Sequence, residues 1–222
     1  MPHDIPEKRT IFIVDDHPVV RQGLALLINR EPDLAVCGDA EESTSARCRI
    51  QELKPALVIV DISLSGPDGL DLLKDIRAHH SNLPVLILSM LDEALYAERA
   101  LRAGASGYIM KQEATERVLV AIRRILNGEI YVSERMSNRM LHRFVGSEVG
   151  QRSPIAELTD RELEVFRLIG EGHGTRQIAE QLLLSVKTVE SYQAHLKVKL
   201  SLRNSRELVQ RAIQWTIAYK SS

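Results

Sequence analysis

The chain has 222 residues, 44% of them hydrophobic and 27% charged, which is typical of a globular protein with one large domain or two ordinary ones. Its apolar runs are far shorter than the roughly 20 residues of a membrane span, and its N-terminus lacks the apolar core of a signal peptide, so we expect a cytoplasmic protein without a membrane partner. The net charge of −1 excludes no partner. From Arg152 onward the chain has eleven Lys and Arg against eight Asp and Glu, so the last part is mildly basic and the first part is acidic. This asymmetry fits a sensor domain joined to a nucleic-acid domain.

Strand-like and helix-like segments alternate from residue 10 to residue 127. The sequence predicts strands at 11–14, 34–37, 57–60, 85–88 and 107–110, and helices at 19–29, 43–53, 69–78, 93–103 and 113–126. This alternation indicates βαβ units with right-handed crossovers, so we expect an α/β fold with a doubly wound, five-stranded parallel sheet. Cys37 and Cys48 fall in these segments and are expected to be buried free thiols.

A linker and an all-α domain of four helices are expected to follow. Ser, Gly and Pro interrupt weak helical periodicity over 128–156, where one helix is expected around 134–144. After it, the capping box of Thr159 and Glu162 starts a helix that ends at Gly170, and Thr175 and Ser185 are expected to cap helices at 177–182 and 186–200. Asn204 and Glu207 would cap a last helix that ends near Trp215. The predicted boundaries are therefore 9–127, 128–156 and 157–222.

Polar residues follow the strands of the predicted sheet, where parallel sheets bind ligands. Asp15 and Asp16 end the first strand, and Asp61 ends the third. Converging carboxylates repel one another unless a cation neutralises them, and Mg²⁺ prefers oxygen ligands of this kind. Ser89 and Lys111 follow the fourth and fifth strands and could donate to phosphoryl oxygens. The pattern indicates a Mg²⁺-assisted transfer of a phosphoryl group to Asp61, although each residue taken singly could be only a turn, cap or solvated side chain.

Together these residues resemble the receiver domain of two-component response regulators, a flavodoxin-like fold. The resemblance rests on the segments 14–17, 88–89 and 103–108, with Asp61, Asp68, Gly69 and Lys111. It implies that Asp61 accepts a phosphoryl group from a sensor histidine kinase. It also implies that Asp15, Asp16, Asp61 and the Ser63 carbonyl hold Mg²⁺. Ser89 and Lys111 would contact the phosphoryl group.

Tyr108 and the loop after Asp61 are the two parts of the receiver segment that the family pattern does not fully specify. Tyr108 matches the family's aromatic switch, with an amphipathic residue at the sheet edge as the alternative. Ser65 stands where the family often has proline, and the proline is Pro67. This departure puts the loop geometry in doubt, and with it the lifetime of the phosphorylated state.

The last four helices resemble the LuxR-type helix-turn-helix of NarL/FixJ regulators; a bundle for protein contacts is the alternative. The resemblance rests on Leu158–Val165, Ile178-Ala179, Leu182, Ser185, Thr188-Val189, Lys199-Leu200 and Glu207–Val209. Apolar residues expected in the core are Ile178, Ala179, Leu182, Val189, Leu196 and Leu200. Phosphate contacts are expected from Lys187, Thr188, Lys197, Lys199 and Arg203, and base contacts from Glu190, Ser191 and Ala194. Many relatives have Lys at the position of Glu190, so a different operator is expected.

These features predict a phosphorylation-activated transcriptional regulator rather than an enzyme. A homodimer on two half-sites of double-stranded DNA is expected when the protein is phosphorylated. Val209, Ala212, Ile213 and Trp215 of the last helix would form either the dimer face or part of the core. A phosphohydrolase would need an Asp where the chain has Ser63. A DNA-binding or interaction module that does not respond to phosphorylation is the remaining alternative.

Overall fold

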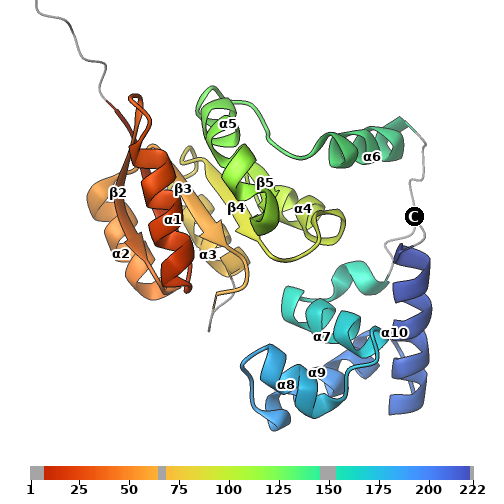
Figure 1. Cartoon of the computed structure of the whole chain (residues 1–222). Helices are drawn as coiled ribbons and strands as arrows, with labels where there is room; N and C mark the ends of the chain where they lie inside the picture. The colour runs from red at the N-terminus through yellow and green to blue at the C-terminus, as the bar shows by residue number, and fades with distance from the viewer. Residues whose placement is uncertain (1–7, 65–68, 146–153, 221–222) are drawn as a thin grey trace, which may run out of the picture. The chain divides into compact units, whose positions relative to one another are not determined.

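The computed structural model describes residues 8–64, 69–145 and 154–220, which fall into two compact units (Figure 1). The contacts divide the chain into Met1–Ser147 and Glu148–Ser222. The first unit is an α/β layer structure and the second is all-helical, so the fold class predicted from the sequence is confirmed. None of the helices in the described ranges is long and apolar enough to cross a lipid bilayer.

A five-stranded parallel sheet forms the centre of the first unit. Its strands are β1 (Arg9–Val14), β2 (Leu34–Ala40), β3 (Leu57–Asp61), β4 (Val85–Ser89) and β5 (Gly107–Met110). Their order is β2-β1-β3-β4-β5, so the direction of winding reverses between β1 and β3. Strand β2 runs three residues beyond its predicted end, because a register shift against β1 between Ile11 and Phe12 lets the pairing continue to Ala40.

Five helices cover the two faces of this sheet (Figure 1). They are α1 (Pro18–Asn29), α2 (Ser43–Leu53), α3 (Gly69–His79), α4 (Glu93–Arg102) and α5 (Ala114–Leu126), the last preceded by a 3₁₀ turn, η1 (Lys111–Glu113). Alternate strand residues, such as Ile11 and Ile13, pack with apolar residues of α1 and α5 in one core. The intervening strand residues, including Tyr108, lie on the face covered by α2, α3 and α4.

The predicted linker begins as an extension of the sheet edge. Tyr131 forms an isolated parallel bridge with Gly107 of β5. A Cβ atom on Gly107 would lie 2.7 Å from the carbonyl oxygen of Tyr131, so glycine is what permits this close approach. The helix expected around 134–144 is present as α6 (Glu134–Val145), and α6 packs against α4.

The second unit contains η2 (Pro154–Glu157), α7 (Asp160–Gly170), α8 (Thr175–Gln181), α9 (Val186–Lys199) and α10 (Ser205–Lys220). The capping box of Thr159 and Glu162 and the Ser185 cap are confirmed. The Thr175 cap is wrong: the helix starts at Thr175 itself, because Gly174 takes the cap position and its N–H donates to Gln177 at 2.8 Å. Helix α10 also runs beyond Trp215, to Lys220.

The core of this unit lies between α7, α9 and α10. The expected core residues Ile178, Ala179, Val189 and Leu196 are buried, whereas Leu182 and Leu200 are only half-buried. Gly170 allows α7 and α10 to touch, since a Cβ atom there would lie 2.2 Å from Thr216 Oγ1 and 2.5 Å from the carbonyl oxygen of Ala212.

The two thiols differ from expectation. Both cysteines are free, but Cys37 is half-buried and Cys48 is exposed. Cys48 lies on α2, an amphipathic helix that buries Ser43, Ala46 and Ile50 and leaves the face of Cys48 to solvent.

Candidate functional site

Four potential ligands meet at the carboxyl edge of the sheet. Asp15, Asp16 and His17 follow β1, and Asp61 ends β3. One ligand atom from each lies within 4.8 Å of the others. The strands β1 and β3 are the neighbours between which the winding reverses, which is where doubly wound sheets bind ligands. The convergence of the acidic residues predicted from the sequence is therefore present.

Lys111 lies between two of these carboxylates. Its Nζ atom is 2.7 Å from Oδ2 of Asp15 and 2.7 Å from Oδ2 of Asp61. The second oxygen of Asp61 accepts a hydrogen bond from the backbone N–H of Ser63 at 2.9 Å. The side chains of Asp61 and Asp15 are 0% and 2% exposed, so this ion pair is shielded from water.

The electrostatics of the site favour a further cation. Burial raises the pKa of the Asp61 carboxyl above its ordinary value, and Lys111 opposes this only in part. Burial lowers the pKa of Lys111, but the carboxylates of Asp61 and Asp15 more than offset it, so the lysine stays charged. Three carboxylates and one ammonium group leave an excess of negative charge.

The donor set fits a hard divalent ion. Carboxylate oxygens from Asp15, Asp16 and Asp61 are the ligands that Mg²⁺ prefers, and it commonly adds phosphate oxygens to one or two of them. The Nδ1 atom of His17 lies 2.6 Å from Oδ1 of Asp16, but its side chain is 62% exposed. The site can therefore hold a metal ion. Ser65 and Pro67, where the loop departs from the family pattern, lie outside the described residues.

Ser89 and Tyr108 hold the same backbone residue, Leu91. The hydroxyl oxygen of Ser89 accepts from the N–H of Leu91 at 3.0 Å, and the Tyr108 hydroxyl donates to the Leu91 carbonyl at 2.8 Å. Both side chains are buried. Burial raises the pKa of Tyr108 far above its ordinary value, so the hydroxyl remains a donor. Tyr108 lies on the edge strand β5, but its side chain is buried and is an internal anchor of the β4–α4 connection.

Arg21 of α1 is a site residue that sequence reasoning missed. Its guanidinium donates to the backbone carbonyl of Asp15 at 2.6 Å and to Asp39 at the end of β2 at 2.8 Å. Arg21 therefore fixes the backbone that presents the acidic pair. The signal in the sequence is a basic residue in the first turn of the helix after an acidic strand end. Its partner Asp39 is 18 positions away and could not be inferred.

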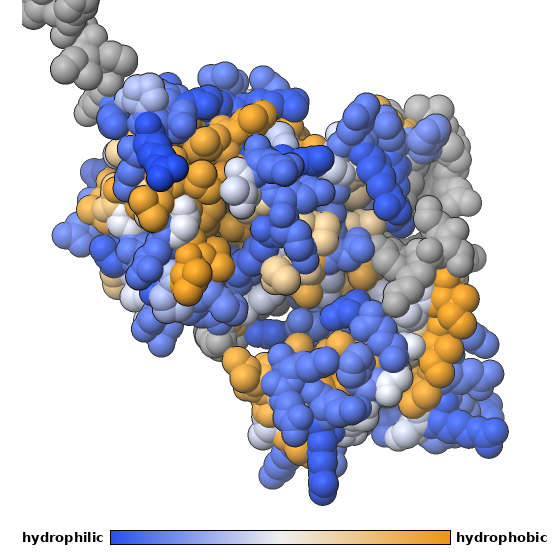
Figure 2. Space-filling view, viewed as in Figure 1, coloured by the Kyte–Doolittle hydropathy of each residue, from blue (hydrophilic) through white to orange (hydrophobic). Residues whose placement is uncertain are grey.

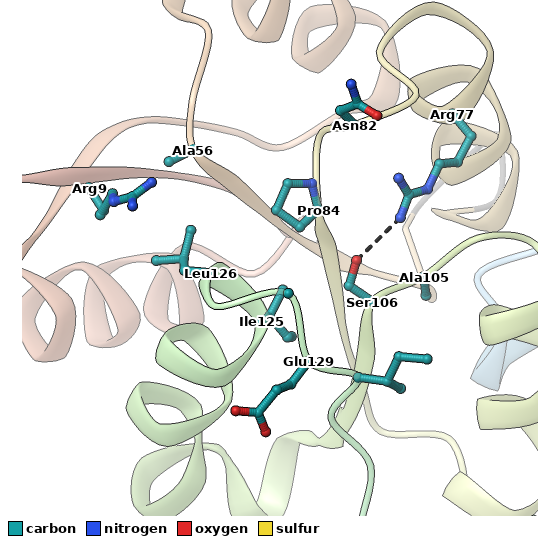
Figure 3. A pocket seen from close by; sticks show the side chains of 12 residues that line it. Arg9, Ala56, Arg77, Asn82, Pro84, Ala105, Ser106, Ile125, Leu126 and Glu129 are labelled. Carbon is teal, nitrogen blue, oxygen red and sulfur yellow. Dashed lines mark hydrogen bonds between the residues drawn. The ribbon is translucent and has the colours of Figure 1, made fainter.

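A cavity of about 560 Å³ lies at the opposite, amino edge of the sheet (Figure 3). Residues that precede the strands line it, including Ala56, Pro84 and Ser106. Two arginines, Arg9 and Arg77, line the cavity, and Arg77 donates to the carbonyls of Gly104 and Ser81 and to the Ser106 hydroxyl. These internal contacts engage Arg77, and the cavity lies at the edge of the sheet away from Asp61.

Of the predicted DNA-contacting residues, all but Arg203 lie on helix α9, and Arg203 follows it. Glu190, Ser191 and Ala194 are exposed, as are Lys187, Lys199 and Arg203, whereas Thr188 and Lys197 are half-buried. The preceding turn is set by Leu183, whose φ of +53° is left-handed. The Gln193 amide donates to Thr175 Oγ1 at 3.2 Å and joins α9 to α8. These two helices have the form of a helix-turn-helix.

Lys199 makes an internal contact. Its Nζ atom lies 2.7 Å from the buried carboxylate of Glu162 on α7. Burial raises the pKa of Glu162, but hydrogen bonds from Lys199 and Thr159 outweigh it, so the pKa is lowered and the carboxylate stays charged. The ion pair connects α9 to α7, and it competes with any contact between Lys199 and phosphate.

Family models match both units. The response regulator receiver domain matches residues 11–123, and the model of bacterial regulatory proteins of the luxR family matches residues 156–212. The chain belongs to the two-component response regulators. It is of the NarL/FixJ type, with a receiver and a LuxR-type DNA-binding domain, and its function is regulation of transcription through DNA binding that phosphorylation controls.

Relatives and solved structures support the same family. The oxygen regulatory protein NreC of Staphylococcus haemolyticus is 37% identical over 209 residues, which is 92% of this chain and 96% of NreC. A LuxR-family response regulator from Aurantimonas is 33% identical, with a TM-score of 0.58 over 63% of this chain and 99% of its own. RcsB of Salmonella enterica serovar Typhimurium bound to promoter P1flhDC is 27% identical, with a TM-score of 0.60 over 93% of this chain and 98% of its own.

Proposed function

We propose that Asp61 is the phosphoryl acceptor of this response regulator and that a sensor histidine kinase is the donor. The observation that carries the proposal is the buried contact of Asp61 with Lys111, beside two further carboxylates. A carboxylate oxygen of Asp61 attacks the phosphorus, an acyl phosphate bond forms, and the bond from phosphorus to the donor nitrogen breaks. Lys111 remains beside the reacting oxygens and offsets their charge.

Mg²⁺ is the proposed cofactor of this step. Asp15, Asp16 and Asp61, with the carbonyl of Ser63, would hold the ion, which when bound neutralises charge on the phosphoryl oxygens. Arg21 keeps the backbone of Asp15 in place through its carbonyl contact. The protein's own residues thus supply the nucleophile, the ammonium group and the metal ligands, and the donor supplies the phosphoryl group.

Ser89 is the proposed sensor of the new phosphoryl group. Its hydroxyl would turn toward the phosphoryl oxygens and leave the N–H of Leu91, which it now accepts from. Tyr108 holds the carbonyl of the same residue, so the segment before α4 would rearrange together with the tyrosine. The energy of the switch comes from the charge-assisted contacts to the phosphoryl group, which are stronger than the neutral bond that is lost.

The DNA-binding domain is proposed to read DNA with α9. Lys187, Thr188, Lys197 and Arg203 would position the helix on phosphates, and Lys199 would contribute only where its bond to Glu162 opens. Glu190, Ser191 and Ala194 would face base edges. A glutamate can accept from the amino group of cytosine, so Glu190 is expected to alter operator preference.

A dimer on two half-sites is the proposed active form. Helix α10 exposes Val209, Ile213 and Ile217, which recur every four residues and form an apolar stripe on its surface (Figure 2). Of the other two residues considered for a dimer face, Ala212 is fully buried, and Trp215 is half-buried with its ring 5.5 Å from that of Phe166. DNA as the target implies that the protein acts in the cytoplasm.

Phosphate incorporation tests the acceptor. Full-length protein is incubated with acetyl phosphate and Mg²⁺, and the phosphoprotein is resolved by phosphate-affinity electrophoresis. Wild type should gain a shifted band that hydroxylamine removes, as expected for an acyl phosphate, and Asp61→Asn should not. Asp75→Asn, which removes a surface carboxylate from α3, is the matched control. An equal band in Asp61→Asn would overturn the assignment.

Selection from random DNA duplexes tests the output. A motif should be enriched from phosphorylated wild type and enriched weakly from Asp61→Asn. Lys187→Ala should weaken binding to all sequences and reduce the salt dependence by about one counterion, whereas Glu190→Gln should change the motif itself. A motif that is independent of phosphodonor and of Asp61 would identify a DNA binder controlled in another way.

A further inference from the structure

The first turn of α6 carries only half of a capping box. The hydroxyl of Ser133 accepts from the N–H of Met136 at 3.1 Å, as a helix cap does. In a complete box, the residue three positions after the cap is Glu or Gln, and its side chain accepts from the N–H of the cap. Helix α7 has this form, with Glu162 accepting from Thr159 at 2.7 Å. In α6 the corresponding residue is Met136, which cannot accept in this way.

The missing carboxylate comes from α4. Oε1 of Glu93 accepts from the backbone N–H of Ser133 at 2.8 Å, and Oε2 accepts from the Ser133 hydroxyl. Glu93 is the first residue of α4, so its charge lies in the first turn of that helix as well as at the start of α6. A negative charge is favourable at both helix N-termini. The side chain of Met136 is buried.

We propose that Glu93 is the docking residue for the linker helix: it completes the cap of α6 from α4, and phosphorylation of the receiver releases it. The chain before Ser133 is held to β5 by backbone bonds, from the N–H of Tyr108 to Tyr131 at 2.8 Å and from the N–H of Tyr131 to Ser106 at 3.0 Å. Residues up to Tyr131 are therefore attached to the sheet, and Ser133 is attached to α4 through Glu93.

The release step rests on the proposed function. Glu93 lies two residues after Leu91, which Ser89 and Tyr108 hold from both sides of its backbone. When the Ser89 hydroxyl turns to the phosphoryl group, the segment that positions Glu93 loses one of these two anchors. Helix α6 is the segment through which the chain continues toward the DNA-binding domain. Its undocking would therefore give that domain a longer and freer tether.

Hydrogen exchange of the full-length protein without phosphodonor tests the docking. Amides of residues 134–142 should exchange about ten-fold faster or more in Glu93→Ala than in wild type, because the charge-assisted bonds at the helix start are lost and, unlike Gln, Ala cannot accept from Ser133. Ser133→Ala should act in the same direction. Glu98→Ala removes another carboxylate from α4, one paired with Arg102, and should leave these amides unchanged. The amides of α5 report whether each variant is folded. Exchange in a folded Glu93→Ala equal to that of wild type would overturn the proposal.

Phosphorylation of the same samples tests the release. Acetyl phosphate with Mg²⁺ should speed exchange at 134–142 in wild type and add little in Glu93→Ala, where the helix is already undocked. Phosphate-affinity electrophoresis measures the phosphorylated fraction in parallel. A phosphorylated wild type with unchanged protection refutes the release. If no phosphate enters Asp61, the proposed function fails and the release fails with it, while the comparison of resting variants still decides the docking.

Discussion

The ammonium group of Lys111 lies 2.7 Å from Oδ2 of Asp61, the residue that is the proposed phosphoryl acceptor. The lysine also contacts Oδ2 of Asp15 at 2.7 Å. Lys111 and a cation bound by these carboxylates would therefore compete for the same negative charge. Their balance sets both the affinity for Mg²⁺ and the stability of the receiver without it.

Replacement of Lys111 by Met tests this competition. The variant should bind Mg²⁺ several-fold more tightly than wild type, because one positive charge beside the carboxylates is removed. Its melting temperature should be lower in EDTA and should rise more on addition of Mg²⁺. Titration calorimetry and thermal denaturation measure the two effects. Lys74→Met, which removes an exposed lysine from α3, is the control. Weaker Mg²⁺ binding in Lys111→Met would contradict this account.

The stability of the metal-free protein should depend on the protonation of Asp61. Burial raises the pKa of Asp61 in the folded state, so the folded protein binds the Asp61 proton more tightly than the unfolded chain does. The stability that this proton contributes is fully present below the ordinary pKa of 3.8 and is lost as the pH rises through the folded pKa. From acidic to neutral pH, the free energy of unfolding of wild type should therefore fall relative to that of Asp61→Asn, and Mg²⁺ should reduce this fall. Urea unfolding at several pH values gives the comparison. A difference that is constant with pH would show that Asp61 is not destabilised by burial.

Arg21 should control the affinity of the acidic cluster. Arg21→Ala removes the bond to the Asp15 carbonyl and should weaken Mg²⁺ binding by roughly ten-fold, as is common when a group that orients a metal ligand is lost. The effect should appear in titration calorimetry before any phosphodonor is added. Arg47→Ala, on α2 and paired with Asp75, is the matched control. If Arg21→Ala lowered stability but left the Mg²⁺ affinity intact, its role would be structural only.

Glu162 should stabilise the DNA-binding domain. Glu162→Gln loses the ion pair with Lys199 and weakens the cap of α7, with an expected cost of about 1 to 2 kcal/mol. Since the pKa of Glu162 is lowered in the folded state, this contribution should be lost as pH falls below its ordinary value of 4.5.

The single tryptophan, Trp215, packs on Phe166 in this domain, so its fluorescence follows the unfolding of the domain in the full-length chain. Glu171→Gln, which breaks the Arg167 pair at the end of α7, should have a smaller effect. Equal destabilisation by the two variants would argue against a special role for Glu162.

The sequence alone determined the secondary-structure elements and the edge of the sheet at which the site residues lie. Periods of two and of 3.6 residues distinguish strands from helices, and caps such as Thr159 and Ser185 are local contacts between residues three positions apart. In a parallel sheet every strand points the same way, so residues such as Asp15, Asp61 and Lys111 that follow strands must meet at one edge. The predicted site could therefore be read without coordinates.

Only the tertiary structure decided which partners these residues have. The Asp15 carbonyl meets Arg21, Lys199 meets Glu162 and Ser133 meets Glu93, across separations of 6, 37 and 40 positions. Exposure was decided in the same way, since a residue on an amphipathic helix is buried only where another element covers it: Ala212 is buried, whereas Val209 and Ile213 of the same helix are exposed. Local patterns specify the element and its direction, while long-range contacts depend on how the elements pack, and no local spacing encodes them.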